Sequence, residues 1–297
     1  MADCMRTFEY RKIDAFTSEN SLGNPAACVY LETRQTLTAS EMLNIAKQHK
    51  GFVSEVVYCV PKSQCVFGLT YYSSECEVDF CGHGTIACMY SLIKETPDLL
   101  KQKEITIHTN KKGALTVFNE IETQDAVYIT APNPQYIGSE IDCGEIAEKM
   151  SLDISQISTV HPIDLIDAGL RTLIIPIVAL SDAISVFPNE NALKGFCLKH
   201  EIDIVLTYTF ETDDPRNIAH TRVFAPKFGY LEDPATGSGN SAFGYYMLKN
   251  DMWKGTPATI EQGGRDRVFN SVNLSYKENC MLFGGKATTR IKGVYYL

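Results

Sequence analysis

Two glycine-rich stretches contain the residues whose types and spacing are best suited to chemistry. The first runs from Asp79 to Tyr90 and contains Gly82-His83-Gly84, and the second runs from Pro234 to Tyr245 and contains Gly237-Ser238-Gly239. In both, an alanine follows three residues after the second glycine. The first glycines are 155 residues apart, about half of the 297 residues in the chain. This spacing predicts a duplicated fold, with two equivalent glycine turns and one site between the halves.

Each glycine turn leads into a predicted helix. A helix N-terminus exposes backbone N–H groups without helical partners and the positive end of the helix dipole. Glycines at that point let an anion approach the backbone closely. Two such helix starts can hold a carboxylate and stabilise negative charge that develops on a substrate beside it. We therefore expect a small anionic substrate that carries a carboxylate.

Four side chains are candidates for moving a proton on such a substrate: Glu55, Cys81, His83 and Asp233. Cys81 immediately precedes Gly82, where a helix N-terminus would lower the pKa of the thiol. Racemisation by two thiols would need a second cysteine before Gly237, but Thr236 stands there. A hydroxyl without a partner is a poor base at neutral pH. The two stretches thus favour a one-base proton shuttle over symmetric racemisation.

Glu55 lies in the apolar, β-rich stretch Phe52–Val60. If its neighbours Val53 and Val56 are buried with it, loss of water would raise the pKa of the carboxyl group. Strict alternation along a strand would instead point Glu55 toward solvent. Periodicity by itself leaves both environments open.

Two other kinds of site are disfavoured by their context. The first glycine turn mimics part of a dinucleotide-binding fingerprint, but it recurs in the second half and lacks the alternating strand and helix pattern of such a domain. Cys76, Cys81 and His83 lie close together in the sequence, yet their spacing matches no common zinc pattern. We therefore expect no metal and no dinucleotide.

Charge and composition argue against several classes of protein, namely nucleic-acid-binding, membrane and secreted proteins. The net charge of −9 argues against nonspecific binding to nucleic acid or to an anionic membrane. The chain has 10 cysteines without a Cys-x-x-Cys pair. It also has no secretory apolar segment after Met1 and no apolar run of the roughly 18 residues that span a bilayer. These features predict a cytoplasmic protein with reduced thiols.

Strands dominate the predicted secondary structure, with one long helix in each half, so we expect an α+β fold. The predicted strands span residues 8–16, 25–31, 52–60, 66–73, 105–108, 114–118, 126–130, 171–178, 204–209 and 221–226. The predicted helices span residues 38–50, 85–94, 143–150, 181–186, 190–200 and 241–249. Two prolines in Ala131-Pro132-Asn133-Pro134 interrupt the pattern. They predict an N-terminal half of residues 1–130, with the last strand at about 286–297 as a candidate addition, and a C-terminal half of residues 131–285.

Seven motifs occur in order along nearly the whole chain. They are Asp14-Ala15-Phe16-Thr17, Gly23-Asn24-Pro25-Ala26-Ala27, Ser54-Glu55, Phe80-Cys81-Gly82-His83-Gly84-Thr85, Arg222-x-Phe224-x-Pro226, Glu232-Asp233-Pro234-Ala235-Thr236-Gly237-Ser238 and Gln262-Gly263 through Arg265. Together they resemble the PhzF family of phenazine biosynthesis-like isomerases and epimerases, which has the diaminopimelate epimerase-like fold. Val56 stands where a threonine is usual and Gly84 where an alanine is usual, so the resemblance leaves the substrate open.

The resemblance implies two pseudo-symmetric halves, each a barrel-like sheet around a central helix, with the site in the cleft between them. It implies that Glu55 shuttles the proton and that His83 and Asp233 assist and orient. It implies that Gly82, Gly84, Gly237 and Ser238 hold the substrate carboxylate. Asn24, Thr85 and Gly239 are further expected substrate-binding residues. It also implies a homodimer without a metal or organic cofactor.

Two other functions remain open at this stage. One is an amino-acid racemase or epimerase that uses Cys81 with a partner other than a thiol. The other is a non-catalytic protein that binds a small molecule with the same residues.

Overall fold

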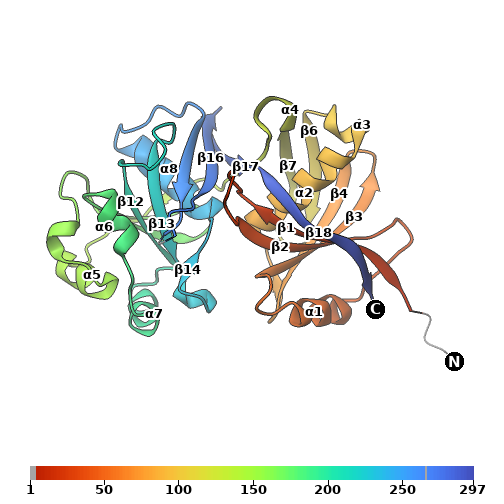
Figure 1. Cartoon of the computed structure of the whole chain (residues 1–297), viewed down its shortest axis with the longest axis horizontal. Coiled ribbons are helices and arrows are strands. Elements are labelled where there is room, and N and C mark those ends of the chain that lie inside the picture. The colour runs from red at the N-terminus through yellow and green to blue at the C-terminus, as the bar shows by residue number, and fades with distance from the viewer. Residues whose placement is uncertain (1–4, 265) are drawn as a thin grey trace. The chain divides into compact units, whose positions relative to one another are not determined.

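The computed structural model describes residues 5–264 and 266–297, so Arg265 of the last motif lies outside the described residues. The chain forms two compact units (Figure 1). The first unit contains the chain up to Thr17, then Leu22–Thr130 and Gly284–Leu297. The second contains Ser18–Ser21 and Ala131–Phe283.

The first unit is a curved sheet around one long helix. Its elements are β1 (Thr7–Ala15), β2 (Asn24–Tyr30), α1 (Ala39–Gln48), β3 (Glu55–Ser63), β4 (Val66–Ser73), β5 (Glu77–Val78), α2 (Gly82–Glu95), α3 (Pro97–Leu100), β6 (Glu104–Thr109), β7 (Gly113–Glu120), α4 (Ile121–Gln124), β8 (Ala126–Thr130) and β18 (Ala287–Tyr296). The strands pair in the order β18–β1–β2–β3–β4–β6–β7–β8. Helix α2 contacts β18 and β1 near one end of this order and β8 at the other, so the sheet curls around the helix.

Helix α2 is central because it is apolar around almost its whole circumference. Every residue from Gly84 to Ser91 is buried, and so is Ile93. A helix that is hydrophobic on all sides is stable only when the fold encloses it. This burial fixes the start of α2 against the inner face of the strands.

The second unit repeats this plan. Its elements are β9 (Gln135–Tyr136), α5 (Cys143–Met150), the 3₁₀ turn η1 (Ile154–Gln156), β10 (Asp164–Asp167), β11 (Arg171–Pro176), α6 (Leu180–Ser185), α7 (Glu190–Lys199), β12 (Ile204–Thr209), β13 (Ala219–Phe224), η2 (Pro226–Phe228), β14 (Glu232–Asp233), α8 (Gly237–Lys249), β15 (Ala258–Gln262), β16 (Asn270–Lys277) and β17 (Cys280–Gly285). The pairing order is β9–β10–β11–β12–β13–β15–β16. Helix α8 contacts β10, β11, β12 and β16.

The two units have matching topology. In the first, β2 and β3 are parallel across α1, and β4 and β6 are parallel across β5 and α2. In the second, β11 and β12 are parallel across α6 and α7, and β13 and β15 are parallel across β14 and α8. Parallel neighbours need such crossover connections. The predicted duplication and the α+β fold are therefore confirmed.

The predicted starts of the two long helices were wrong. The glycines were expected to form loops ahead of helices at Thr85 and Ser241, but α2 begins at Gly82 and α8 at Gly237. Cys81 and Thr236, the residues before them, have extended backbone with φ of −128° and −123° and act as the N-caps. The glycines therefore lie inside the first helical turns.

Close packing explains glycine in these turns. A Cβ on Gly84 would lie 2.8 Å from Cγ2 of Val57 and 2.9 Å from Sγ of Cys81, and one on Gly237 would lie 2.2 Å from the ring of Phe283. Val57 has no exposed surface, so it has little room to yield. The first turn of each long helix is pressed against the sheet.

A deeply buried arginine secures the short strand β14. Arg222 of β13 is 0% exposed, and its Nε and Nη2 donate to the Glu232 carboxylate at 2.8 and 2.7 Å. Its Nη1 donates to three carbonyl oxygens, those of Ala183, Ile184 and Val186. Because Glu232 directly precedes Asp233, this pair also holds Asp233 in place.

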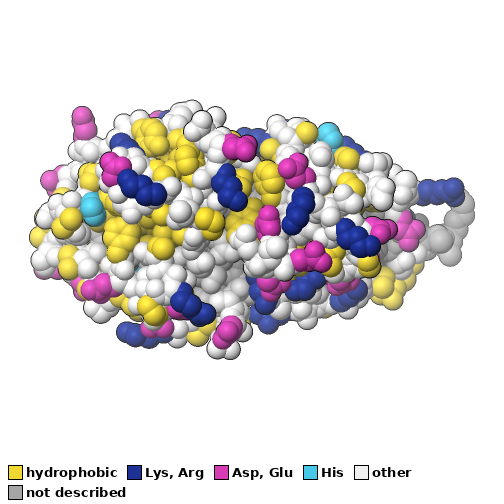
Figure 2. Space-filling model, turned by 90° about the horizontal axis from the view of Figure 1, so that it is seen from above, with side chains coloured by type: hydrophobic (Ala, Val, Ile, Leu, Met, Phe, Trp, Pro, Cys, Tyr) yellow, Lys and Arg dark blue, Asp and Glu magenta, His cyan; other side chains and the backbone are white. Residues whose placement is uncertain are grey.

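Charged side chains of both signs share the surface. On the face shown in Figure 2, Lys and Arg side chains lie among Asp and Glu side chains, with apolar side chains between them. Within the described ranges, none of the helices combines the length and the apolar character needed to cross a membrane.

The packing predicts opposite effects for one substitution in two helices. Gly84→Ala should lower the free energy of unfolding by about 1–3 kcal/mol, because the new methyl group overpacks against Val57 and Cys81. Gly195→Ala in α7 should raise it by about 0.5–1 kcal/mol, because nothing lies within 4 Å of a Cβ there. Urea unfolding of both variants measures this, and equal effects would contradict the packing argument.

The buried ion pair predicts a second stability effect. Arg222→Lys should lower the free energy of unfolding by about 3 kcal/mol, since lysine cannot replace the paired and carbonyl hydrogen bonds of a buried guanidinium. Arg171→Lys is the control, because that side chain is 40% exposed and pairs with exposed Glu201. It should cost no more than about 1 kcal/mol in the same urea unfolding experiment. A cost for Arg222→Lys no larger than that of the control would refute the role.

Candidate functional site

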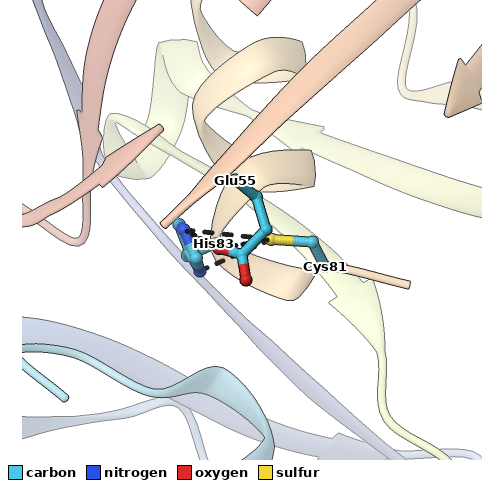
Figure 3. Close-up of side chains that lie close together, drawn as sticks. All are labelled: Glu55, Cys81 and His83. Atoms are coloured by element: carbon cyan, nitrogen blue, oxygen red, sulfur yellow. Dashed lines mark hydrogen bonds and ion pairs between the residues drawn. The ribbon is translucent and has the colours of Figure 1, made fainter. Parts of the chain in front are cut away.

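Glu55 is the first residue of β3 and lies between two strands. It is opposite Ala26 of β2 and Ser73 of β4 in the register. Val56 and Val57, which follow it, are 1% and 0% exposed, whereas the Glu55 side chain keeps 19% of its surface exposed. Instead of projecting freely into solvent, it faces Cys81 and His83 (Figure 3).

Cys81 caps helix α2 with its sulfur. The Gly84 backbone N–H donates to Sγ at 3.2 Å, and Sγ lies 3.9 Å from Oε2 of Glu55. The residue is 5% exposed. An N–H donor and the positive end of the helix dipole both stabilise negative charge on this sulfur.

His83, in the first turn of α2, completes a cluster with these two residues. Its Nε2 lies 3.3 Å from Oε2 of Glu55, and its Nδ1 lies 3.5 Å from Sγ of Cys81. Burial lowers the pKa of His83 to about 4, although the Pro25 carbonyl favours the charged form. The imidazole is therefore neutral at pH 7, so its contact with Glu55 is not an ion pair at that pH.

Other predicted residues of the first unit surround this cluster. Thr85 is fully buried, and its hydroxyl donates to the Cys81 carbonyl at 2.8 Å and lies 2.7 Å from Oη of Tyr71. Thr85 therefore supports the cap of α2. Asn24, 2% exposed, begins β2 just before Pro25, and Gly82 begins α2 itself.

The second unit places Asp233 in a different network. The Thr236 hydroxyl donates to Oδ2 of Asp233 at 2.6 Å, and the Thr236 backbone N–H donates to Oε1 of Gln262 at 3.0 Å. Gln262 in turn donates to the Asp233 carbonyl at 2.8 Å, and Asn240 donates to Oε1 of Gln262 at 2.6 Å. The proton of the Thr236 hydroxyl is thus used in a hydrogen bond to a carboxylate.

The helix start of the second unit lies directly beside that network. Gly237 and Gly239 are buried in the first turn of α8, and Ser238 between them is half-buried. The structure therefore groups the predicted residues into two sets. Glu55, Cys81 and His83 form one within the first unit, and Asp233 accompanies the α8 start in the second.

The two sets differ in their chemistry despite their matching frames. The repeat places Thr236 where the first unit has Cys81, since each is the N-cap of its long helix. Glu55 and Ile204 are the first residues of β3 and β12, which hold equivalent places in the two sheets. The cluster of carboxylate, thiol and imidazole in the first unit is thus not repeated in the second.

Residue types and spacing did not reveal three of the supporting side chains. Gln262 is 0% exposed on β15 and links Asp233 to the α8 cap, but it entered the prediction only as part of a terminal motif. Asn240 and Tyr71 are likewise buried. A polar residue inside an otherwise apolar strand or helix is the signal that could have identified Gln262 and Asn240.

The cluster also brings together three types of metal ligand. One ligand atom from each of Glu55, Cys81 and His83 lies within 4.8 Å of the other two. Cys76, considered with Cys81 and His83 as a sequence pattern, is instead an exposed thiol. Glu55 replaces it in the spatial group because β3 and the α2 start meet.

Comparison with known proteins identifies the family. The model of the PhzC-PhzF family, described as phenazine biosynthesis-like protein, matches residues 13–293. The chain is 27% identical to Antisense-enhancing sequence 1 of Schizosaccharomyces pombe, with 99% of this chain and 100% of that protein covered. It is 29% identical to the uncharacterized isomerase YfhB of Bacillus subtilis, with 87% of each covered.

A solved structure shares the fold. The PhzF-family phenazine biosynthesis protein of Bacillus anthracis superimposes with a TM-score of 0.85 at 24% identity, covering 98% of this chain and 100% of that one. The range matched by the family model, residues 13–293, spans both glycine-rich stretches and Glu55. The chain belongs to the PhzC-PhzF family of phenazine biosynthesis-like proteins.

Proposed function

We propose that this PhzF-like isomerase moves a proton within a small carboxylate-bearing substrate and that Glu55 carries the proton. The observation that supports this most directly is the cluster itself. A partly buried carboxylate contacts a neutral imidazole and a helix-capping thiol, at 3.3 and 3.9 Å. Relatives of this family include proteins named as isomerases in Bacillus subtilis and Escherichia coli.

The chemistry requires a base and a place for negative charge. When Glu55 removes a proton from carbon, charge develops on the substrate group conjugated to that carbon. The α2 start suits this charge, because the first N–H groups of a helix have no helical acceptors. In α2 the Gly84 N–H donates to Sγ of Cys81, and the Thr85 N–H donates to the Cys81 carbonyl. The backbone N–H groups of Gly82 and His83 remain outside the helical hydrogen-bond pattern.

His83 and Asp233 have assisting roles in this proposal. A neutral imidazole orients the Glu55 carboxyl group and exchanges a hydrogen bond with it as the proton is taken up and returned. Asp233 orients the substrate and Ser238 binds it in this proposal, which are the roles that the family resemblance implies. The protonated Glu55, whose side chain is 19% exposed and so can exchange its proton with water, then delivers a proton to a second carbon, which completes an isomerisation with no net gain or loss of atoms.

A racemase or epimerase that uses Cys81 is the second candidate. The observation in its favour is the hydrogen bond from Gly84 to Sγ, which stabilises a thiolate. A two-base reaction would need a partner at the equivalent cap, and there the Thr236 hydroxyl donates to Asp233. Because the Thr236 hydroxyl donates to Asp233, we favour Glu55 over a pair of cap residues as the base.

Exchange with solvent deuterium tests the role of Glu55. A panel of small carboxylates with an acidic C–H is incubated with the protein in D₂O, and the mass of each is measured over time. Glu55→Gln should lower the exchange rate of the responding compound by at least about 100-fold, as expected for loss of a general base. Glu77→Gln on β5 of the same unit is the matched control and should exchange at the wild-type rate.

The alternatives give different outcomes in the same experiment. If Glu55→Gln exchanges normally and Cys81→Ser does not, the reaction depends on the thiol and the second candidate is correct. Ligand-induced thermal stabilisation without exchange by the wild type would identify a binding protein that is not an enzyme. Circular dichroism and thermal unfolding confirm that each variant is folded.

A further inference from the structure

We propose that Glu55, Cys81 and His83 form a binding site for a zinc-type divalent ion, which inhibits the enzyme. The three side chains come from two elements that are brought together only by the fold, β3 and the start of α2. They supply a carboxylate oxygen, a sulfur and an imidazole nitrogen, which are the ligand types found in protein zinc sites.

The distances between the ligand atoms support this assignment. Nε2 of His83 lies 3.3 Å from Oε2 of Glu55 and 3.8 Å from Sγ of Cys81, and Sγ lies 3.9 Å from Oε2. A tetrahedral zinc ion with ordinary bond lengths separates its nitrogen and oxygen ligands by about 3.4 Å, and its sulfur from either by about 3.6 Å. The three side chains therefore form one face of a zinc tetrahedron after shifts of a few tenths of an ångström.

Charge balance favours such an ion at this place. Binding a divalent cation releases the thiol proton to solvent, so that a thiolate, a carboxylate and a neutral imidazole surround it. The two negative ligands cancel the charge of the ion, which suits a cluster whose side chains are only 5–19% exposed. The remaining exposure leaves the fourth position open to water.

The surrounding contacts hold the ligands in position before an ion arrives. The Gly84 N–H donates to Sγ of Cys81, and the Thr85 hydroxyl donates to the Cys81 carbonyl. Glu55 is held by pairing on both sides of β3. Preorganised ligands with such supporting contacts strengthen a metal site.

The ligand set also determines which ions should bind. A thiolate with an imidazole favours zinc and similar transition ions, whereas Mg²⁺ and Ca²⁺ prefer oxygen ligands. A bound ion would occupy the Glu55 oxygen and the Cys81 sulfur, so neither would be free to accept a proton. This inhibitory consequence rests on the proposed function, but the binding of the ion does not.

Titration with Co²⁺ tests the site on the full-length protein, after treatment with a chelator and in a reductant that is not a thiol. One equivalent of Co²⁺ should produce the thiolate-to-cobalt charge-transfer absorption of a tetrahedral site, and Zn²⁺ should abolish it by displacement. Mg²⁺ and Ca²⁺ should have no effect. Absence of this absorption in the wild type would overturn the proposal.

Matched variants identify the ligands. Cys81→Ser should eliminate the charge-transfer band, and Glu55→Gln or His83→Asn should weaken Co²⁺ binding by at least about tenfold, since even supporting residues of a metal site contribute that much. Cys76→Ser, at an exposed thiol of the same unit, and Glu77→Gln should retain the wild-type band and affinity. A band that persists in Cys81→Ser would place the ion elsewhere and refute the proposed site.

The metal test and the test of catalysis fail independently. Deuterium exchange in chelator-treated protein reports on Glu55 without any ion. If exchange depends on Glu55 but no Co²⁺ band forms, only the metal site is wrong. If the band forms and depends on Cys81 while Glu55→Gln exchanges normally, the site is correct and the proposed function is wrong.

If the metal site and the role of Glu55 are both correct, adding Zn²⁺ should stop deuterium exchange and a chelator should restore it. Undiminished exchange with Zn²⁺ bound would refute inhibition.

Discussion

The start of α2 against the buried face of the sheet is the constraint on which the candidate site depends. The helix is enclosed on almost all sides, so its first turn has to fit against Val57, and glycine at position 84 avoids the close contacts that a Cβ would make with Val57 and Cys81. The same fit directs the Gly84 N–H to the sulfur of Cys81. His83 then lies in the first helical turn, beside the strand end that carries Glu55.

Duplication supplied two such helix starts, and the two have diverged. In the first unit the cap is a thiol beside a carboxylate and an imidazole. In the second, the residue at the N-cap position is Thr236, whose hydroxyl donates to Asp233 instead of capping the helix, and Gln262 and Asn240 stabilise that arrangement from buried positions. The two units share a topology, but the first places a carboxylate, a thiol and an imidazole together at its helix start, and the second places a hydrogen-bonded carboxylate there.

The properties that suit the first cluster to proton transfer also suit it to a metal ion. Proton transfer benefits from a carboxylate with restricted access to water and from neighbours that tolerate either of its charge states. A transition ion benefits from the same closeness of oxygen, nitrogen and sulfur. In the two proposals a proton and a transition ion compete for the same lone pairs, so the free concentration of such ions would determine activity.

The sequence by itself determined the duplication, the family and several element bounds, including those of β4, β8, β12 and α5, because local patterning and repeated motifs specify these features. The resemblance, rather than periodicity, singled out Glu55, because alternation leaves the direction of a residue at a strand end undecided. Only the tertiary structure showed that Glu55 meets Cys81 and His83. That meeting depends on long-range strand register and on the enclosure of α2, which local sequence does not encode. For the same reason, glycines that looked like loop residues proved to lie inside the two long helices.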